Sequence, residues 1–569
     1  MKQLSGLDAS FLYMENGSSF GHVCSLSTYE RPDDPGFDPF EAFRAAVEAA
    51  LPELEPFRRR LVEVPLGLDR PYWIADPHFD LDFHLRHLAI PPHGDEELVG
   101  DQIARIIGRQ MDRTKPLWEA YVIEGLPGNE FGILTKIHHA TIDGASGVEL
   151  LGILLETTPR PFPTGPVEDD WRPQTMPTVN ELLRRTVINY ATQPGKATRL
   201  GLRVVRQLAA ASRNVELANV LDRVRRSIPV PGTDNHDRPP MLPVKTAPPT
   251  PFNKSITPHR RFAMRSVPLE HIKAIKNGLG ATVNDVVMAV CAGALRTYLE
   301  EHHALPDAPL VGMVPVSIRT GAEEDRWTNR VSGLIADLPT NVEDPIGRVS
   351  AMHDTMTAAK QRFDMLPADA ISDLAQFAPP ALATRAIRMA TAARMADRLN
   401  PPFNLVISNV PGPRQPMYLG TAKMKHYFPV STVVDGQGLN ITVQSYVDSL
   451  DFGLVACREL VPDLWHLADL CVAEVDRLLA LSAASEQPTA APEAPTAAPG
   501  QAAKPRRARS AAKANGSKAS ATTSAAAPKP VPSTRAKSAA KAAGDAAADQ
   551  PSTARTRRAT SSGASHSAR

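Results

Sequence analysis

The sequence predicts a mixed α/β protein with two domains, a helical connector between them and a disordered tail behind the second. Three observations support this prediction. The chain has 569 residues, more than a single ordinary core accommodates. Short apolar strands and amphipathic helices occur in two separate blocks, and proline-rich stretches divide the blocks. The blocks are 1–156 and 255–481, the connector is 157–254 and the tail is 482–569.

The first block, 1–156, combines both kinds of periodicity. "EAYVIEGL" at Glu119–Leu126 and "FGILTKIHH" at Phe131–His139 are typical of strands. "DEELVGDQIARIIGRQM" at Asp95–Met111 has apolar positions at helical spacing. The connector then shows apolar residues at helical spacing with arginines on the other face, for example in "VNELLRRTVINY" from Val179. Such a helix either packs on its own protein or lies on a membrane surface, and both alternatives stay open.

The second block, 255–481, repeats the mixture. "LVGMVPVSI", "FNLVISNV" and "LNITVQSYV" predict strands, and "NDVVMAVCAGALRTYLEEH" at Asn284–His302 predicts a helix. The tail contains Ala, Pro, Ser, Thr and Lys with almost no large apolar side chain, so it cannot bury enough surface to order itself. From Ala483 onward there are 14 Lys/Arg and 4 Asp/Glu, a net charge of +10, while the whole chain carries +1. The tail is either an electrostatic attachment to anionic lipid or nucleic acid, or a solubilising appendage.

The first residues and the cysteines indicate the compartment. The start lacks a basic segment followed by an apolar one, and the apolar runs are too short and too interrupted for a transmembrane helix. The four cysteines are scattered in apolar contexts without a C-x-x-C pair, which argues against a zinc site or a disulfide framework. We therefore expect a cytoplasmic protein whose cysteines are buried small hydrophobic residues.

One short segment, "LTKIHHATIDGASGVELL", carries two adjacent histidines and an Asp-Gly pair. A strand-like pattern precedes the histidines and a helical one follows, so His138, His139, Asp143 and Gly144 are predicted on a strand-to-helix turn. Neighbouring strand residues point to opposite faces, which disfavours one metal bound by both histidines. Ser146 does not lie in a G-x-S-x-G nucleophile elbow. A histidine acting as general base remains, beside the alternative of a purely structural turn.

His-His-x-x-x-Asp-Gly is the motif of CoA-dependent acyltransferases shaped like chloramphenicol acetyltransferase. Further stretches resemble, in the same order, the bacterial wax ester synthase/diacylglycerol acyltransferase family. These stretches are "SGLDASFLYMEN", "DRTKPLWEAYVIEGL", "TVNDVVMAVCAGALRTYL", "VPVSIR" and "NLVISNVPGP". The resemblance covers about Leu4 to Leu481 and leaves only the tail unexplained.

The resemblance implies two chloramphenicol acetyltransferase-like domains with the active centre in a tunnel between them. It implies transfer of a long-chain fatty acyl group from acyl-CoA, as co-substrate, to diacylglycerol or to a long-chain alcohol, with no bound cofactor and no metal. His139 would be the general base and His138 a supporting residue. Asp143 would be structural, with Arg319 as its candidate partner, and Gly144 would supply a backbone position closed to other residues.

Other residues of the resembling stretches have two interpretations each. Pro116, Leu117 and Trp118 would line an acyl channel, but Trp118 is equally consistent with ordinary core. The remaining candidates, which either serve the reaction centre or cap a helix and form a rigid turn, are Asn284, Asp285, Ser408 and Asn409.

Two other functions remain open at this level. One is a catalytically silent lipid- or surface-binding protein of the same fold, and the other is a condensation-type acyltransferase with a different acceptor. The protein would stay in the cytoplasm, either free or peripheral at the inner membrane or lipid inclusions, and would contact nucleic acid only through its tail. The acceptor alcohol, the acyl-chain length and the oligomeric state leave no short motif in the sequence.

Overall fold

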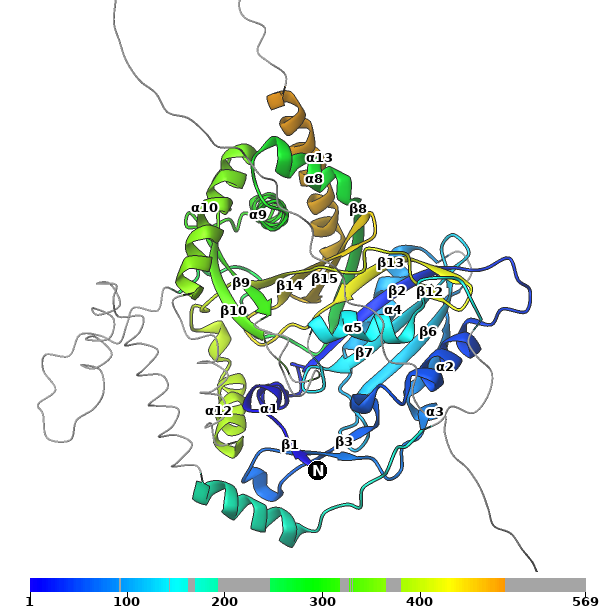
Figure 1. The fold of residues 1–569 in the computed structure, drawn as a ribbon. Helices are drawn as coiled ribbons and strands as arrows, with labels where there is room; N and C mark the ends of the chain where they lie inside the picture. The colour runs from blue at the N-terminus through cyan, green and yellow to red at the C-terminus, as the bar shows by residue number, and fades with distance from the viewer. Residues whose placement is uncertain are drawn as a thin grey trace, which may run out of the picture. The chain divides into compact units, whose positions relative to one another are not determined.

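Two six-stranded sheets with helices packed against them confirm the predicted mixed α/β fold with two domains (Figure 1). The computed structural model of the protein describes residues 1–91, 94–142, 144–161, 169–192, 246–317, 327, 329, 331–364 and 380–486. Residues 1–490 form one compact unit. The description ends at residue 486, so most of the predicted tail, 482–569, lies outside it.

The first six-stranded sheet carries the histidine motif. Its strands are, in spatial order, β12 (Tyr418–Leu419), β13 (Ala422–Val430), β2 (His22–Glu30), β7 (Glu130–His138), β6 (Trp118–Leu126) and β5 (Leu85–Ala89). Only β5 and β6 pair in parallel; the other neighbours are antiparallel. The central strand β7 buries side chains on both of its faces, Ile133 and Ile137 on one and Leu134 on the other. A smaller sheet beside it contains β1 (Lys2–Gln3), β4 (Tyr72–Ala75) and β3 (Arg59–Val62).

The second six-stranded sheet belongs to the carboxyl-terminal half. Its spatial order is β10 (Val331–Leu338), β9 (Leu310–Ser317), β11 (Leu405–Val410), β14 (Leu439–Tyr446), β15 (Ser449–Cys457) and β8 (Arg260–Pro268). Strand β11 is parallel to both of its neighbours, and the remaining pairs are antiparallel. Strand β15 is buried along its whole length, as expected for a strand covered on both faces.

Helices cover these sheets, and side chains cap the beginning of several of them. The helices of the amino-terminal half are α1 (Gly6–Tyr13), α2 (Pro39–Ala50), α3 (Leu81–His84), α4 (Glu96–Ile107) and α5 (Gly144–Leu154). Those of the carboxyl-terminal half are α8 (Leu269–Gly278), α9 (Val283–Glu301), α10 (Pro345–Asp364), α12 (Pro380–Ala392) and α13 (Leu464–Glu486). Of these, α1, α2, α3, α4 and α9 begin at a side chain that caps them. Three short 3-10 helices are η1 (Glu55–Arg58), η2 (Pro65–Gly67) and η3 (Met395–Asp397). Helix α9 is apolar almost all round because it packs against α10 and α13 as well as the sheet (Figure 1).

The two halves are joined by a strand that crosses between them. By its place in the chain, β13 falls in the predicted domain 255–481, yet it pairs with β2 of the first sheet. It also runs against β15 of the second sheet, where a side chain at Gly453 would meet the carbonyl oxygen of Pro429 at 1.7 Å. A glycine is therefore required for the two sheets to approach this closely. The pairing could not be derived from sequence order alone.

One hydrophobic core continues across both halves. Leu134 of β7 and Val99 and Ile103 of α4 belong to the same buried cluster as Phe262 of β8 and Leu464 of α13. Helix α4 packs directly against β8. The histidine motif thus lies on a sheet that is held by the second domain as well as by the first.

The connector is described only in part. Residues 179–192 form the expected helix, whereas 193–245 lie outside the described residues. The helix packs on its own protein: Asn189 donates hydrogen bonds to Asp69 (2.7 Å) and to the hydroxyl of Tyr72 (3.1 Å), and Tyr190 donates to the carbonyl of Leu68 (2.7 Å). For this segment the structure supports packing on the protein, the first of the two alternatives.

Two further properties concern the pairing of the cysteines and the length of the apolar helices. All four cysteines are unpaired and buried, as predicted. Within the described ranges no single helix is long and apolar enough to cross a bilayer, and α8 with α9 meets that test only as a pair bent by 100°.

Candidate active site

The two histidines lie where the sequence predicts them, between a strand and a helix. Strand β7 ends at His138, and α5 begins at Gly144. The N–H of His138 donates to the carbonyl of Leu117 (3.0 Å), and the N–H of His139 donates to the carbonyl of Gly21 (2.7 Å). Neighbouring segments on both sides therefore fix the backbone of this turn.

The ring of His139 is half-buried and rests on a residue of the first helix. It stacks on Phe11 of α1, with 4.2 Å between ring centroids and 4° between ring planes. The carbonyl of His139 accepts a hydrogen bond from the side-chain amide of Asn329 (2.5 Å), which also donates to Asp8 (2.7 Å). Burial raises the pKa of Asp8, although Ser5 and Asn329 donate to it. Helix α1 thus holds His139 by its ring and, through Asn329, by its backbone.

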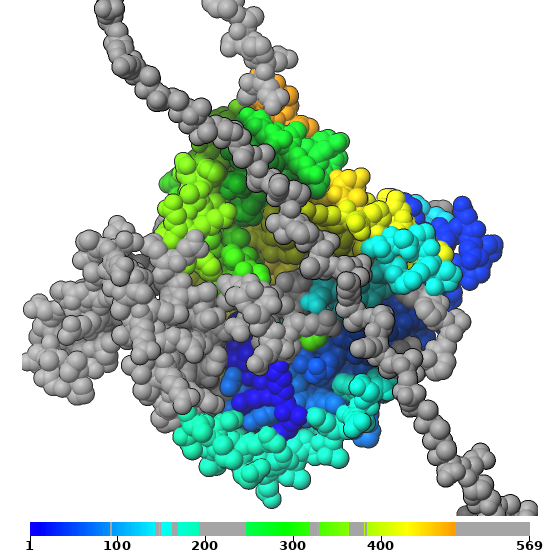
Figure 2. Space-filling model, in the orientation of Figure 1, coloured from blue at the N-terminus to red at the C-terminus, as the bar shows by residue number. Residues whose placement is uncertain are grey.

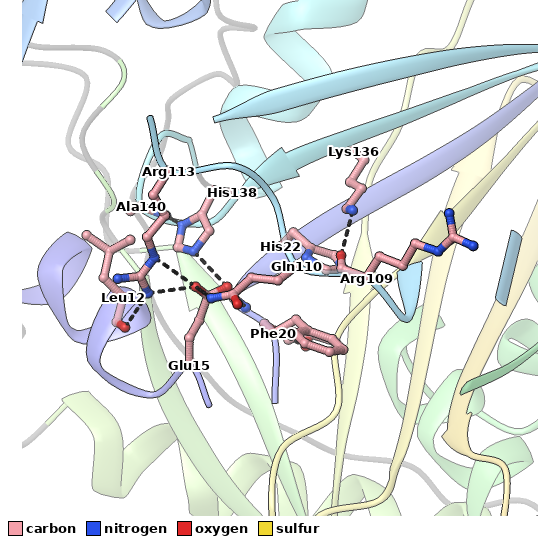
Figure 3. Close-up of polar contacts among 12 residues, drawn as sticks. Leu12, Glu15, Phe20, His22, Arg109, Gln110, Arg113, Lys136, His138 and Ala140 are labelled. Carbon is pink, nitrogen blue, oxygen red and sulfur yellow. Dashed lines mark hydrogen bonds and ion pairs between the residues drawn. The ribbon is translucent and has the colours of Figure 1, made fainter. Parts of the chain in front are cut away.

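The side chain of His138 has different surroundings, as expected from strand geometry. Its imidazole is only 1% exposed, and Nδ1 accepts a hydrogen bond from the N–H of Ala140 (3.0 Å). Its Nε2 lies 3.2 Å from Oε1 of Glu15, which is within ion-pair distance but outside regular hydrogen-bond geometry. Figure 3 shows the imidazole between the turn and this carboxylate. His138 is a buried link in the turn, and only the His139 ring is partly open.

Glu15 is buried within a network of donors (Figure 3). Its Oε1 accepts the N–H of Gly21 (2.8 Å), and its Oε2 accepts from Arg113 (2.7 Å) and Gln110 (3.1 Å). Burial by itself would raise the pKa of the Glu15 carboxyl, but His138, Gly21 and Arg113 outweigh burial and hold that pKa well below its ordinary value. Glu15 is therefore a carboxylate at neutral pH. Glu15 is not among the residues predicted from the sequence, because no spacing in "SGLDASFLYMEN" indicates chemistry.

Gly21 lies at the point where these contacts meet. A Cβ atom at this position would be 2.8 Å from Nε2 of His138 and 2.9 Å from the carbonyl oxygen of Phe11. Any residue larger than glycine at this position would force these neighbouring atoms to move. Gly21 therefore permits the close approach of β2, α1 and the histidine turn.

Two further buried residues, Lys136 and His22, were not among the residues predicted from the sequence. Lys136 donates a hydrogen bond to the carbonyl of Arg109 (2.7 Å; Figure 3) and one to that of Ile106 (3.3 Å). Nε2 of His22 donates to the carbonyl of Ile107 (2.8 Å). Burial and the neighbouring Lys136 lower the pKa of His22 well below its ordinary value. Both side chains satisfy carbonyls at the end of α4 and so attach this helix to the sheet.

The other residues of the histidine motif are only partly described. Gly144 is the first residue of α5, as its predicted place on the turn requires. Asp143 and its candidate partner Arg319 lie outside the described residues, so their pairing stays a prediction.

Pro116, Leu117 and Trp118 lie directly beside the histidine turn. The carbonyl of Leu117 accepts the N–H of His138, as described above. Trp118 is 2% exposed, donates its indole N–H to the carbonyl of Phe57 (2.8 Å) and stacks between Phe57 and His84. This environment corresponds to the core interpretation of Trp118 rather than to a channel wall.

The candidates in the second domain meet one another. Asn409 of β11 donates to Asn284 (3.4 Å), although 125 residues separate them. Asp285 completes a capping box with Thr282, and its carboxylate also accepts from His353 (2.8 Å). Burial would raise the pKa of Asp285, but these donors lower it overall. The helix-capping interpretation therefore applies to Asp285.

Ser408 lies on the same strand and pairs in register with Thr442 of β14. Within the described ranges, none of the hydrogen bonds formed by the second-domain candidates reaches the histidine turn.

Two cavities lie near residues of the site. A cavity of about 800 Å³ is lined by Glu15 and Arg113 and by apolar side chains of β3 and of 176–182, and it includes no residue of the turn. A smaller one of about 290 Å³ is lined by Ala140 and Thr141, which follow His139 in the chain, and by Asp8, which is linked to the His139 carbonyl through Asn329. The predicted tunnel between the two domains stays a prediction. Among the described residues no group of three or more His, Cys, Asp or Glu side chains could hold a metal ion.

Comparison with known proteins covers nearly the whole described chain. The family model of the wax ester synthase/diacylglycerol acyltransferase catalytic domain matches residues 4–287, and that of the WS/DGAT C-terminal domain matches residues 327–478. A putative diacylglycerol O-acyltransferase of Mycobacterium tuberculosis is 33% identical over 470 residues, covering 82% of this chain and 88% of the relative. A second one from that organism is 35% identical over 491 residues, covering 84% of this chain and all of the relative.

A solved structure gives the same result. The wax ester synthase/diacylglycerol acyltransferase from Marinobacter aquaeolei VT8 superimposes with a TM-score of 0.59 at 28% identity, covering 85% of this chain and 100% of that chain. Because the family models, the relatives and the fold agree with the histidine motif, the chain belongs to the wax ester synthase/diacylglycerol acyltransferase family and is an acyltransferase.

Proposed function

We propose that the protein transfers a long-chain fatty acyl group from acyl-CoA to the hydroxyl of diacylglycerol, and also to long-chain alcohols. The family assignment supports acyl transfer, and the names of the relatives support diacylglycerol as acceptor. The observation that carries the proposal is the His139 ring, which is half-buried on Phe11 while both of its backbone groups are fixed. Such a ring is held in one orientation, and the residue that carries it is only partly buried.

His139 acts as the general base in this mechanism. A neutral imidazole removes the hydroxyl proton as the alcohol oxygen attacks the thioester carbonyl, and a tetrahedral intermediate forms. The intermediate collapses, the carbon–sulfur bond breaks, and the departing CoA thiolate recovers the proton from the imidazolium. The products are an ester and free CoA, and no covalent enzyme intermediate is needed.

The remaining sequence candidates have supporting roles in this proposal. His138 supports the turn from its buried side, and Asp143 holds the turn through an arginine, with Arg319 as the candidate. Asn409 and neighbouring backbone N–H groups are candidates for contacting the oxyanion, and Asn284 is positioned by its contact with Asn409.

The test is an acyl-transfer assay on purified protein. Labelled palmitoyl-CoA is incubated with dioleoylglycerol or hexadecanol, and neutral lipids are separated by chromatography. His139→Ala should lower turnover by about 100- to 10,000-fold, the usual contribution of a general base. If neither acceptor yields ester with either protein, the proposed function is wrong and a catalytically silent lipid-binding protein becomes the better description. If His139→Ala forms ester at the wild-type rate, His139 is not the general base.

We also propose that the enzyme works in the cytoplasm at a lipid surface, where its acceptor resides. Large apolar side chains are exposed on the segment after β3 and on two helices that contact it: Leu66 (86%) after β3, Val187 (68%) on the 179–192 helix and Met389 (71%) on α12. A Cβ atom at Gly67 would lie 3.6 Å from Ala381 of α12, and the hydroxyl of Tyr190 donates to the carbonyl of Leu68. Figure 2 shows residues of the 179–192 helix along the lower edge of the surface. A soluble surface rarely collects such side chains without a partner.

The lipid-surface proposal has a matched test. Leu66→Gln combined with Val187→Gln should weaken flotation with phosphatidylglycerol-containing vesicles and lower turnover of vesicle-borne dioleoylglycerol. Ile335→Gln is the control, because Ile335 is also exposed (47%) but lies on β10 of the second sheet. Equal vesicle binding by all three proteins would exclude this surface as the lipid contact.

A further inference from the structure

We propose that Glu15 is a positioning residue for the acyl transfer: its carboxylate sets where the proton sits on His138, and His138 in turn fixes the turn that carries His139. The inference rests on the proposed function of His139. It assigns a role to Glu15 of the amino-terminal stretch "SGLDASFLYMEN", a residue that the mechanism above does not use.

The first step concerns the rigidity of Glu15. Both carboxylate oxygens are occupied, Oε1 by the N–H of Gly21 (2.8 Å) and Oε2 by Arg113 (2.7 Å) and Gln110 (3.1 Å). The side chain is only 2% exposed. A buried carboxylate with several donors has a single position, and it presents a fixed negative charge to the remaining neighbour, His138.

The second step concerns the proton on His138. The N–H of Ala140 donates to Nδ1 (3.0 Å), so Nδ1 has to carry a lone pair and not a proton. The ring proton is therefore on Nε2, which lies 3.2 Å from Oε1 of Glu15. An ionised acceptor at this place favours the Nε2–H form over the Nδ1–H form. If the proton were on Nδ1 instead, this N–H group would point at the N–H of Ala140, and neither group could accept a hydrogen bond from the other.

The third step connects this pair to His139. His138 and Ala140 are the chain neighbours of His139, and their hydrogen bond spans it. Gly21, the residue whose N–H binds Glu15, accepts the N–H of His139 through its carbonyl (2.7 Å). Glu15 thus acts on the catalytic residue from both sides without touching it. Small displacements of a reacting group are costly, since about 1 Å lowers rates by roughly 100-fold.

The experiment compares Glu15→Gln with Glu63→Gln. Gln keeps the shape of the side chain and an amide oxygen for the Gly21 N–H, but it removes the charge that faces His138 and places an NH2 group opposite the side chains that donate to Oε2, where the carboxylate has an acceptor. Glu63 is the matched control because it bonds to the same Arg113 (3.0 Å) but is 60% exposed and does not contact His138. We expect Glu15→Gln to lower kcat by about 10- to 100-fold with KM little changed, and Glu63→Gln to equal the wild type.

A double-mutant cycle shows whether the effect passes through His138. Asn at position 138 retains an acceptor for the Ala140 N–H but lacks Nε2. In the His138→Asn background, Glu15→Gln should therefore have no further effect on kcat. A full additional loss in that background would show that Glu15 acts by another route and would overturn the proposal.

A spectroscopic measurement is independent of activity. In protein labelled with 15N-histidine, the imidazole nitrogens with and without a proton have well-separated chemical shifts, and the His138→Asn variant assigns the signal. Wild type should show His138 protonated on Nε2, and Glu15→Gln should shift the signal toward the other form. An unchanged spectrum together with wild-type kcat refutes the proposal even if His139→Ala is inactive. If the wild type itself forms no ester, it is the proposed function that fails.

Discussion

Gly21→Ala is the most direct perturbation of the geometry around the histidine turn. The added methyl group would lie 2.8 Å from Nε2 of His138 and 2.9 Å from the carbonyl oxygen of Phe11. Ordinary contacts of a Cβ begin at 3.4 Å, so these atoms have to separate by roughly 0.5 Å or more. The imidazole of His138 is buried and the Phe11 oxygen is backbone, so neither moves freely.

The magnitude follows from this crowding. Overpacking a tight site costs about 1–3 kcal/mol, and we expect the free energy of unfolding to fall by that amount. The N–H of His139 is bonded to the carbonyl of the same Gly21, so a shift of this segment moves the proposed general base. Since about 1 Å of misplacement costs roughly 100-fold, a shift of half that size should lower kcat/KM by about 10-fold or more.

The assay uses ester formation together with denaturant unfolding, and the chain provides a matched control. Gly17, in the same connection between α1 and β2, has no atom within 4 Å of the corresponding methyl position. Gly17→Ala should therefore keep wild-type activity and stability. If Gly21→Ala also behaved like the wild type, the close approach of β2 to the histidine turn would not exist in solution, and the account of the site would be refuted.

Three further predictions follow from buried or charged groups. Trp118→Ala should lower the free energy of unfolding by about 3–5 kcal/mol in denaturant titrations, because it removes a fully buried ring; a loss below 1 kcal/mol would contradict its place in the core. Burial lowers the pKa of His84 to about 4, so the unfolded chain binds this proton first; stability should fall from about pH 6.5 to 4, and an NMR titration of the His84 ring should give a midpoint near 4. A chain ending at Glu486 lacks 14 Lys/Arg and should keep turnover on dispersed substrates but lose salt-sensitive binding to anionic vesicles; unchanged binding would exclude an electrostatic tether.

The histidine turn was predicted from the local sequence pattern. The alternation in "FGILTKIHH" and the helical spacing after Gly144 are properties of neighbouring residues, and the structure has β7 ending at His138 and α5 beginning at Gly144. The opposite surroundings of His138 and His139 follow from the same period of two. Predictions of this kind succeed because strand and helix periodicities depend on residues a few positions apart.

Contacts between segments that are far apart in the sequence could not be predicted from local patterns. Glu15 meets His138 across 123 residues and Asn329 reaches His139 across 190, and neither residue type at its position signals a function. Strand β13 was assigned to the second domain by sequence order, yet it pairs with β2 in the sheet that carries the histidines. The choice between core and channel for Trp118 likewise depended on which groups surround its ring.

The amino-acid sequence by itself determined the mixed α/β class, the strand-to-helix turn and the residue type proposed as the base, because these depend on periodicity and on the intrinsic acidity of imidazole. Only the tertiary structure decided which histidine is buried, which groups surround its two ring nitrogens and what holds its neighbour in place. The physical reason is that a proton's position depends on the charges and donors within a few ångströms, and here the chain brings those groups in from segments far apart in sequence.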